Sequence, residues 1–330
     1  MLEVIEKDDI DYYYNYMTEL CFFMFFNKEK TLSIRRFEEF HSKYQKDYSS
    51  YYTYKTVLKS LKNAKVLQVN GNAKVRYQYI YYFFVAKYLV KNIDKEEIKK
   101  ILSSLCSKLH YDEFSSIIMF VTHLSKSPFI ITEIIANAKK IFPDHLEMLQ
   151  MEKDIAPINK LIKTLPKQVI ELVKADEVRQ EELEERERME INEKQNDEMD
   201  SIDYDLDADN EDMNMISKII FSYKTMETLG QLAKKYWGSM DKENLYNITY
   251  EVYSLGLKSL KMYIKFVEDH SHLIAEVVKD IVVKKNIRDN FPMKKQIQDV
   301  SDEYLFKLCF ISSMSVVKKI GSSVGYSKLK

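Results

Sequence analysis

Residues that form turns are scarce in this chain, and this scarcity constrains its fold more than any other feature. Only six glycines and five prolines occur among 330 residues. Glycine and proline end helices and shape tight turns, so their scarcity favours long helices joined by few connections. The hydrophobic content of 45% is typical of a folded protein, and the length suggests two domains. The sequence therefore predicts a soluble, mainly α-helical protein.

Apolar residues at helical spacing predict three helices in the first 62 residues. The first covers residues 11–27, the second begins after Ser33, and the third covers residues 52–62. Ser33 is a suitable N-cap because its hydroxyl can accept a hydrogen bond from a free backbone amide of the first turn. The third helix has one apolar face and one basic face, and we expect the basic face to be exposed. Its basic residues are Lys55, Lys59 and Lys62.

A β-hairpin is predicted directly after these helices. Two short runs of strand-forming residues, 65–69 and 73–79, flank the dipeptide Asn70-Gly71. Both of its residues tolerate the positive φ angles that tight hairpin turns require. The segment 75–93 (VRYQYIYYFFVAKYLVKNI) then begins with the alternation of a strand and continues with the periodicity of a helix. The predicted inner face of this helix consists of Tyr82, Phe83, Ala86, Leu89, Val90 and Ile93.

Helical patterns continue over residues 94–175 and resume at residue 215. The first stretch has no repeat of fixed period and is predicted to form a bundle or a solenoid. The second predicts a further helical domain over 215–320, followed by a short polar tail, 321–330. Predicted helices are 95–109, 112–124, 130–141, 145–151 and 158–173 in the first stretch, and 245–267, 272–285 and 303–319 in the second, after a helix that begins near Ile216.

An acidic stretch, residues 176–214, separates these two helical regions. It contains 18 acidic and four basic side chains, a net charge of −14, whereas the remainder carries 46 basic and 33 acidic ones, a net charge of +13. Residues 177–193 can extend a solvated helix. Residues 194–214 have no periodic apolar residues and are predicted to be a flexible linker. The linker residues predicted to act as an electrostatic latch on the basic remainder are Asp203, Asp205, Asp207 and Asp209.

Two segments resemble a known family. Three helices followed by a hairpin is the order of a winged helix, and Y-x-Y-I-Y-Y-F-F-V-A-K-Y-L at residues 77–89 resembles the end of the winged-helix module in bacterial STAND-type, NACHT-like P-loop NTPases. Residues 224–239 (KTMETLGQLAKKYWGS) are similar to the C-terminal helical region of the same proteins. The resemblance implies a winged-helix-like module over 1–93 and a helical array over 94–175 that senses a ligand or partner.

The nucleotide-binding core of that family has no counterpart in this sequence. A phosphate-binding loop requires G-x-x-x-x-G-K-[ST], in which glycines bring backbone amides onto the phosphates and lysine holds the terminal ones. Gly321 and Gly325 come nearest to this spacing, but Tyr-Ser-Lys follows them. We therefore expect this chain to hydrolyse no nucleotide and to need no cofactor.

Other catalytic and metal-binding patterns are weak. His272 and Glu276 are four residues apart and supply only two ligands. The three cysteines lie far apart and form no C-x-x-C pair, which favours reduced thiols in a cytoplasmic protein. The start of the chain has no signal-peptide pattern. The most hydrophobic run, residues 20–26 (LCFFMFF), is much shorter than the roughly 20 residues of a membrane span.

Three functional hypotheses follow. The leading one is a non-catalytic regulatory and sensor region of a STAND-type signalling ATPase system, in bacterial antiviral defence, with a P-loop ATPase on another polypeptide or self-association as its protein contact. The alternative is a winged-helix DNA-binding regulator with a helical dimerisation domain, which would bind phosphates through Lys55, Lys59 and Lys62. The third is a helical interaction scaffold without a switch.

Overall fold

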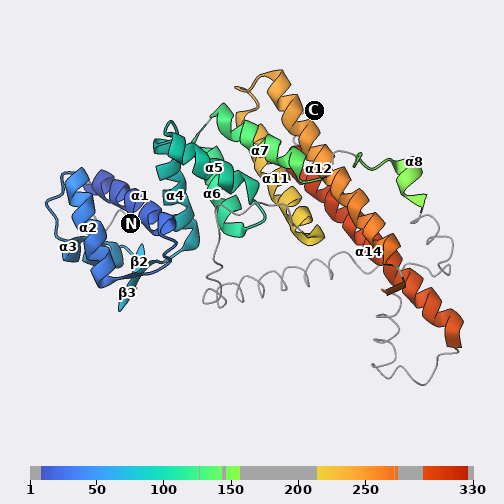
Figure 1. Cartoon of the computed structure of the whole chain (residues 1–330), viewed down its shortest axis with the longest axis horizontal. Coiled ribbons are helices and arrows are strands. Elements are labelled where there is room, and N and C mark those ends of the chain that lie inside the picture. The colour runs from blue at the N-terminus through green and yellow to red at the C-terminus, as the bar shows by residue number, and fades with distance from the viewer. Residues whose placement is uncertain are drawn as a thin grey trace. The chain divides into compact units, whose positions relative to one another are not determined.

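The computed structural model describes residues 9–125, 127–142, 146–156, 214–270, 272–273 and 293–325 (Figure 1). These residues are mainly helical, with one small antiparallel sheet, which confirms the predicted fold class. The chain divides into two compact units. The first consists of residues 1–149, 206–262 and 313–330, and the second of residues 150–205 and 263–312.

The N-terminal part of the first unit contains three helices and three short strands. Each predicted helix forms within two residues of its expected start, and the predicted hairpin follows them. The elements, in chain order, are α1 (Ile10–Phe26), β1 (Leu32–Ser33), α2 (Ile34–Asp47), α3 (Tyr54–Asn63), β2 (Leu67–Asn70) and β3 (Asn72–Val75).

Side-chain caps define the starts of α2 and α3. The Ser33 hydroxyl accepts a hydrogen bond of 3.2 Å from the backbone amide of Arg36, as predicted. Thr53 caps α3 in the same way, by accepting 3.3 Å from the amide of Thr56. Each cap satisfies an amide that has no partner inside its own helix, which typically contributes about 1 kcal/mol.

The strands form an antiparallel sheet in the order β1-β3-β2. Gly71 has a φ of +76° and makes the predicted turn between β2 and β3. Strand β1, in which Leu32 pairs with Ala73, was not predicted, because two residues are too few to show an alternating pattern. The predicted second strand is too long: it ends at Val75, and Tyr77 and Tyr79 belong to the next helix and its cap.

Helix α4 (Gln78–Lys91) lies against both α1 and α6. Of its predicted inner face, only Ala86 and Leu89 are buried; Tyr82, Phe83 and Val90 are partly exposed. The prediction of a single face failed because α4 is covered from two sides, so its buried surface is wider than one helical stripe. The buried residues of α4 are Tyr81, Phe84, Val85, Ala86 and Leu89.

Three helices follow α4 and pack on one another: α5 (Glu96–Ser107), α6 (Asp112–Leu124) and α7 (Pro128–Lys140). They agree with the predicted helices. The predicted helix over 145–151 is wrong, because residues 146–150 are not helical and only the short α8 (Met151–Asp154) follows. Gln150 makes no side-chain cap hydrogen bond at the start of α8, so the helix begins without this stabilisation. The predicted helix 158–173 lies outside the described residues.

The C-terminal helices are α11 (Met215–Tyr236), α12 (Lys242–Asp269) and α14 (Met293–Val324). Helix α11 packs against α6 and α7, so the start of the predicted second domain belongs to the same compact unit as residues 1–149. Helix α14 continues through the start of the predicted polar tail, where Ser323 and Val324 are buried. In the second unit, Val267, Leu305 and Cys309 form a small apolar cluster.

In the part of the chain that the structure describes, no helix has the combination of length and apolar character needed to cross a membrane.

Candidate binding surfaces of the N-terminal module

The predicted basic residues of α3 line one groove. Lys55, Lys59 and Lys62 are all exposed and face a hollow with a volume of about 340 Å³. We call this surface the lysine groove. Its remaining lining residues come from α2, α3 and β2, and they are Ile34, Tyr54, Leu58 and Val69.

The orientation of α3 follows from its buried residues. Val57 and Leu61 are fully buried and lie on the same face, one helical turn apart. The lysines occupy positions i, i+4 and i+7 on a different face, so burying Val57 and Leu61 turns all three lysines toward solvent. Strand β2 then brings Val69 beside them.

The charge of the lysine groove is not neutralised by the described part of the chain. None of its lining residues is acidic. Within the described residues, the three lysines make no ion pair, and the one electrostatic contact among them is between the Lys55 ammonium and the ring of Tyr54, 5.8 Å from its centroid. The groove therefore presents three cations above a partly apolar floor, which favours an anionic partner.

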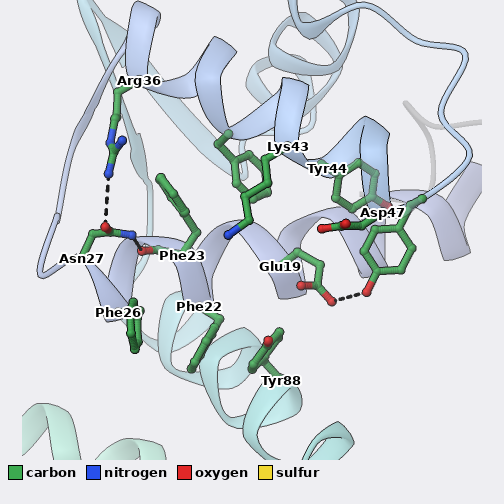
Figure 2. Close-up of a pocket in the computed structure, with 12 residues that line it drawn as sticks. Glu19, Phe22, Phe23, Phe26, Asn27, Arg36, Lys43, Tyr44, Asp47 and Tyr88 are labelled. Atoms are coloured by element: carbon green, nitrogen blue, oxygen red, sulfur yellow. Dashed lines mark hydrogen bonds between the residues drawn. The ribbon is translucent and has the colours of Figure 1, made fainter.

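A second hollow, which we call the aromatic cleft, lies between α1 and α2, with Tyr88 of α4 beneath it (Figure 2). Its volume is also about 340 Å³. Phe22 stacks on Tyr88 with ring centroids 3.7 Å apart and planes inclined by 10°. Phe26 is 65% exposed at the end of α1. The ring of Phe23 lies 4.7 Å from the Arg36 guanidinium, a cation–π contact.

One end of the aromatic cleft is polar. The Tyr48 hydroxyl donates a hydrogen bond of 2.7 Å to Glu19, and the ammonium of Lys91 lies 3.3 Å from the same carboxylate. Burial, followed by the hydrogen bond to Glu19 and the charge of that carboxylate, raises the pKa of Tyr48 to about 12. The phenol is therefore neutral at physiological pH and serves as a donor.

Two further cations, Arg36 and Lys43, line the cleft, and within the described residues Arg36 is paired and Lys43 is not. The Arg36 guanidinium donates to Glu29 at 3.0 Å and to Asn27 at 3.2 Å. Lys43 makes no hydrogen bond or ion pair there, and its ammonium points into the cleft (Figure 2). The cleft can therefore accept an apolar group on its phenylalanines, and its polar lining combines the ammonium of Lys43 with the carboxylates of Glu19 and Asp47.

The sequence prediction missed the aromatic cleft. The available signal was the run at residues 20–26, which contains four phenylalanines within five positions. Such a run cannot bury every ring on one helical face, so some rings must lie elsewhere. Its partner Tyr88 lies more than 60 positions further along the sequence, and no local pattern connects the two.

The predicted acidic latch, Asp203, Asp205, Asp207 and Asp209, lies outside the described residues. Among the residues that the structure does describe, no three His, Cys, Asp or Glu side chains gather in a way that would hold a metal ion.

A family model described as Novel STAND NTPase 4 matches residues 30–85. The matched segment runs from the residues before β1 into the first half of α4, so it contains the sheet, α2, α3 and the lysine groove. Over this segment the chain is similar to STAND NTPases. No curated protein and no solved structure matches the chain.

Proposed function

We propose that this chain is a regulatory and sensing component of a STAND-type signalling system in bacterial antiviral defence, and that it acts through protein contacts and not by hydrolysing nucleotide. The observation that carries the proposal is the position of the family match. It falls on the sheet, α2, α3 and the first half of α4, and within the described residues this is the segment that combines helices with a sheet.

The topology of this part supports its interpretation as a winged helix. The order α1, β1, α2, α3, β2, β3, with β3 central in the sheet and β2 in contact with α3, is the order expected of a winged helix whose hairpin is the wing. The sequence contains no G-x-x-x-x-G-K-[ST] motif. Under the proposal, the ATPase core is therefore supplied by a separate polypeptide or by a longer form of this one.

An ion pair between a half-exposed lysine and a buried glutamate connects this module to the helices that follow it. Lys30, just before β1, pairs with Glu113 of α6, and the Lys30 ammonium lies 4.9 Å from the centroid of the Tyr81 ring of α4. Glu113 is only 7% exposed. Separating the sheet from α6 would break this pair and leave the buried Glu113 carboxylate without its cation, with the hydrogen bond from Tyr81 remaining, and burying an uncompensated charge is costly.

The proposed mechanism is a shift between two populations. A ligand or partner that binds the helices better in one arrangement would stabilise that arrangement and so change the affinity of the winged helix for the ATPase. The Lys30–Glu113 contact and the packing of α4 on α6 are described contacts that couple the two parts.

Affinity purification tests the proposal. The chain would carry a C-terminal tag at its native locus, and co-purifying proteins would be identified by mass spectrometry. We expect a separate P-loop ATPase, or a longer chain that contains one. Recovery of the 39.3 kDa chain alone, under conditions that preserve known complexes of the same cell, would contradict the proposal.

DNA binding is the second candidate function, and the lysine groove is the observation that favours it. Lysines on the third helix of a winged helix can neutralise phosphates, and such binding weakens steeply with salt. Retention on duplex DNA that disappears in the variant Lys55→Glu/Lys59→Glu/Lys62→Glu, together with no ATPase partner, would support this candidate over the first.

A further inference from the structure

We propose that the lysine groove binds an acidic segment of a partner protein in which apolar side chains are interspersed with glutamate or aspartate. This inference rests on the proposed function, because it gives the chemistry of the protein that the module contacts. Three features of the groove carry it: its charge, its floor and its concave shape.

The charge of the groove specifies an anionic occupant. Lys55, Lys59 and Lys62 lie at positions i, i+4 and i+7, so they span about 10 Å along the axis of α3. No acidic residue lines the groove to neutralise them. Carboxylates at one-turn spacing on a helix, or at alternate positions of an extended segment, about 7 Å apart, come closest to the spacing of the three lysines.

The floor of the groove favours a protein over a nucleic acid. Ile34, Leu58 and Val69 line the same hollow as the lysines and are each only partly buried, so part of their apolar surface stays in contact with solvent. A phosphate backbone offers charge but little apolar surface to cover them. Leucine, isoleucine or phenylalanine side chains of a peptide would remove this surface from water.

The shape of the groove also favours a protein partner over a nucleic acid. A helix that reads DNA bases must project into the major groove, with its side chains at the front of the molecule. Here residues of α2, α3 and β2 line a shallow, open hollow of about 340 Å³ together with the three lysines. A hollow of this kind receives side chains from a partner.

Peptide binding measured by fluorescence anisotropy tests the inference on the full-length chain. The first probe is a labelled helical peptide with leucine at one-turn spacing and glutamate elsewhere. The second replaces every leucine by serine and keeps the charge. The third is a short labelled duplex DNA of arbitrary sequence. All three are measured at low and at physiological salt, because exposed charges are screened as salt increases.

We expect the leucine–glutamate peptide to bind at least about tenfold more tightly than the serine–glutamate peptide, because only the first covers the apolar floor. The triple substitution Lys55→Glu/Lys59→Glu/Lys62→Glu should weaken the leucine peptide by about tenfold or more. The matched control Lys46→Glu/Lys95→Glu/Lys100→Glu reverses three exposed lysines outside the groove and should change its affinity by less than about twofold.

A milder variant keeps the test valid if the triple substitution disturbs folding. Val69→Thr is nearly isosteric and adds a hydroxyl to the floor. It should weaken the leucine peptide several-fold and leave the serine peptide unchanged.

Three results would overturn the inference: equal binding of the two peptides, equal effects of the two triple variants, or tighter lysine-dependent binding of the DNA. A failure here is distinguishable from a failure of the proposed function. If the inference alone is wrong, the tagged chain still co-purifies with a P-loop ATPase, and the lysine-groove variant retains that partner.

Discussion

The hydroxyl of Tyr236 donates a hydrogen bond of 3.0 Å to the backbone carbonyl of Thr122. Thr122 lies in the last turn of α6, where carbonyls have no partner within the helix. The ammonium of Lys235 donates to the next carbonyl, that of His123. The end of α11 therefore caps the end of α6, although the acidic stretch 176–214 lies between the two helices in the sequence. This contact makes the two helices parts of one compact unit.

Replacing Tyr236 by phenylalanine should lower the free energy of unfolding by about 1–2 kcal/mol. The substitution keeps the ring but leaves the Thr122 carbonyl without this donor. Urea unfolding followed by circular dichroism measures the change. The matched control is Tyr246→Phe, since Tyr246 is 67% exposed and its loss of a hydroxyl should leave the midpoint unchanged. Equal midpoints for Tyr236→Phe and the wild type would show that the hydrogen bond contributes nothing net.

Replacing Lys30 by methionine should destabilise the chain by about 2 kcal/mol, because the buried carboxylate of Glu113 loses its cation. We expect less than the full cost of breaking a buried pair, since Lys30 itself is half-exposed. The same unfolding measurement applies. A matched control is Lys99→Met, which removes a pair with Glu96 on the surface of α5 and should barely move the midpoint. A smaller effect for Lys30→Met than for this control would remove the coupling contact from the proposed mechanism.

The sequence predicted those features that depend on neighbouring residues. The Ser33 cap, the turn at Gly71 and the exposed lysines of α3 all follow from patterns a few residues long. The Lys30–Glu113 pair and the Phe22–Tyr88 stack could not be predicted, because each joins residues brought together only by the packing of α1, α4 and α6.

Contacts between residues distant in the sequence also explain two element boundaries that the sequence predicted wrongly. The alternating pattern predicts a strand that continues to Tyr79. The residues from Gln78 onward instead form α4, because the helical periodicity buries more apolar surface. Residues 321–324 are small and polar apart from Val324, so the sequence predicts a tail. They instead form the last turn of α14, where Gly230 of α11 packs closely against Ser323. In both cases, contacts with neighbouring helices determined where the helix begins or ends.

The close approach of α11 and α14 supplies a third prediction. A Cβ atom at Gly230 would lie 2.5 Å from the backbone oxygen of Ser323, closer than real contacts allow. Gly230→Ala must therefore push the two helices apart, and we expect a loss of about 1–3 kcal/mol. Gly238→Ala is the control, because a Cβ there meets nothing within 4 Å. If the thermal midpoint of Gly230→Ala equals that of Gly238→Ala, the helices do not pack at this distance.

Alkaline pH should destabilise the N-terminal module through its partly buried phenols. The pKa of Tyr48 is raised from 10.0 to about 12, and that of Tyr12 is raised to about 12, in both cases mainly by burial. The folded state therefore keeps these phenols protonated at a pH where the unfolded chain has released the protons. Their contribution to stability is complete below pH 10 and is lost as the pH rises toward 12.

We expect the free energy of unfolding to fall steadily over this range and the tyrosinate absorbance to rise together with the loss of helical circular dichroism. The variant Tyr48→Phe removes one such proton, so its stability should decrease less steeply with pH above 10, even though it loses the hydrogen bond to Glu19. The exposed Tyr51→Phe is the control and should keep the wild-type slope. An unchanged slope in Tyr48→Phe would mean that Tyr48 titrates as an ordinary exposed phenol, and that the polar end of the aromatic cleft is open to water.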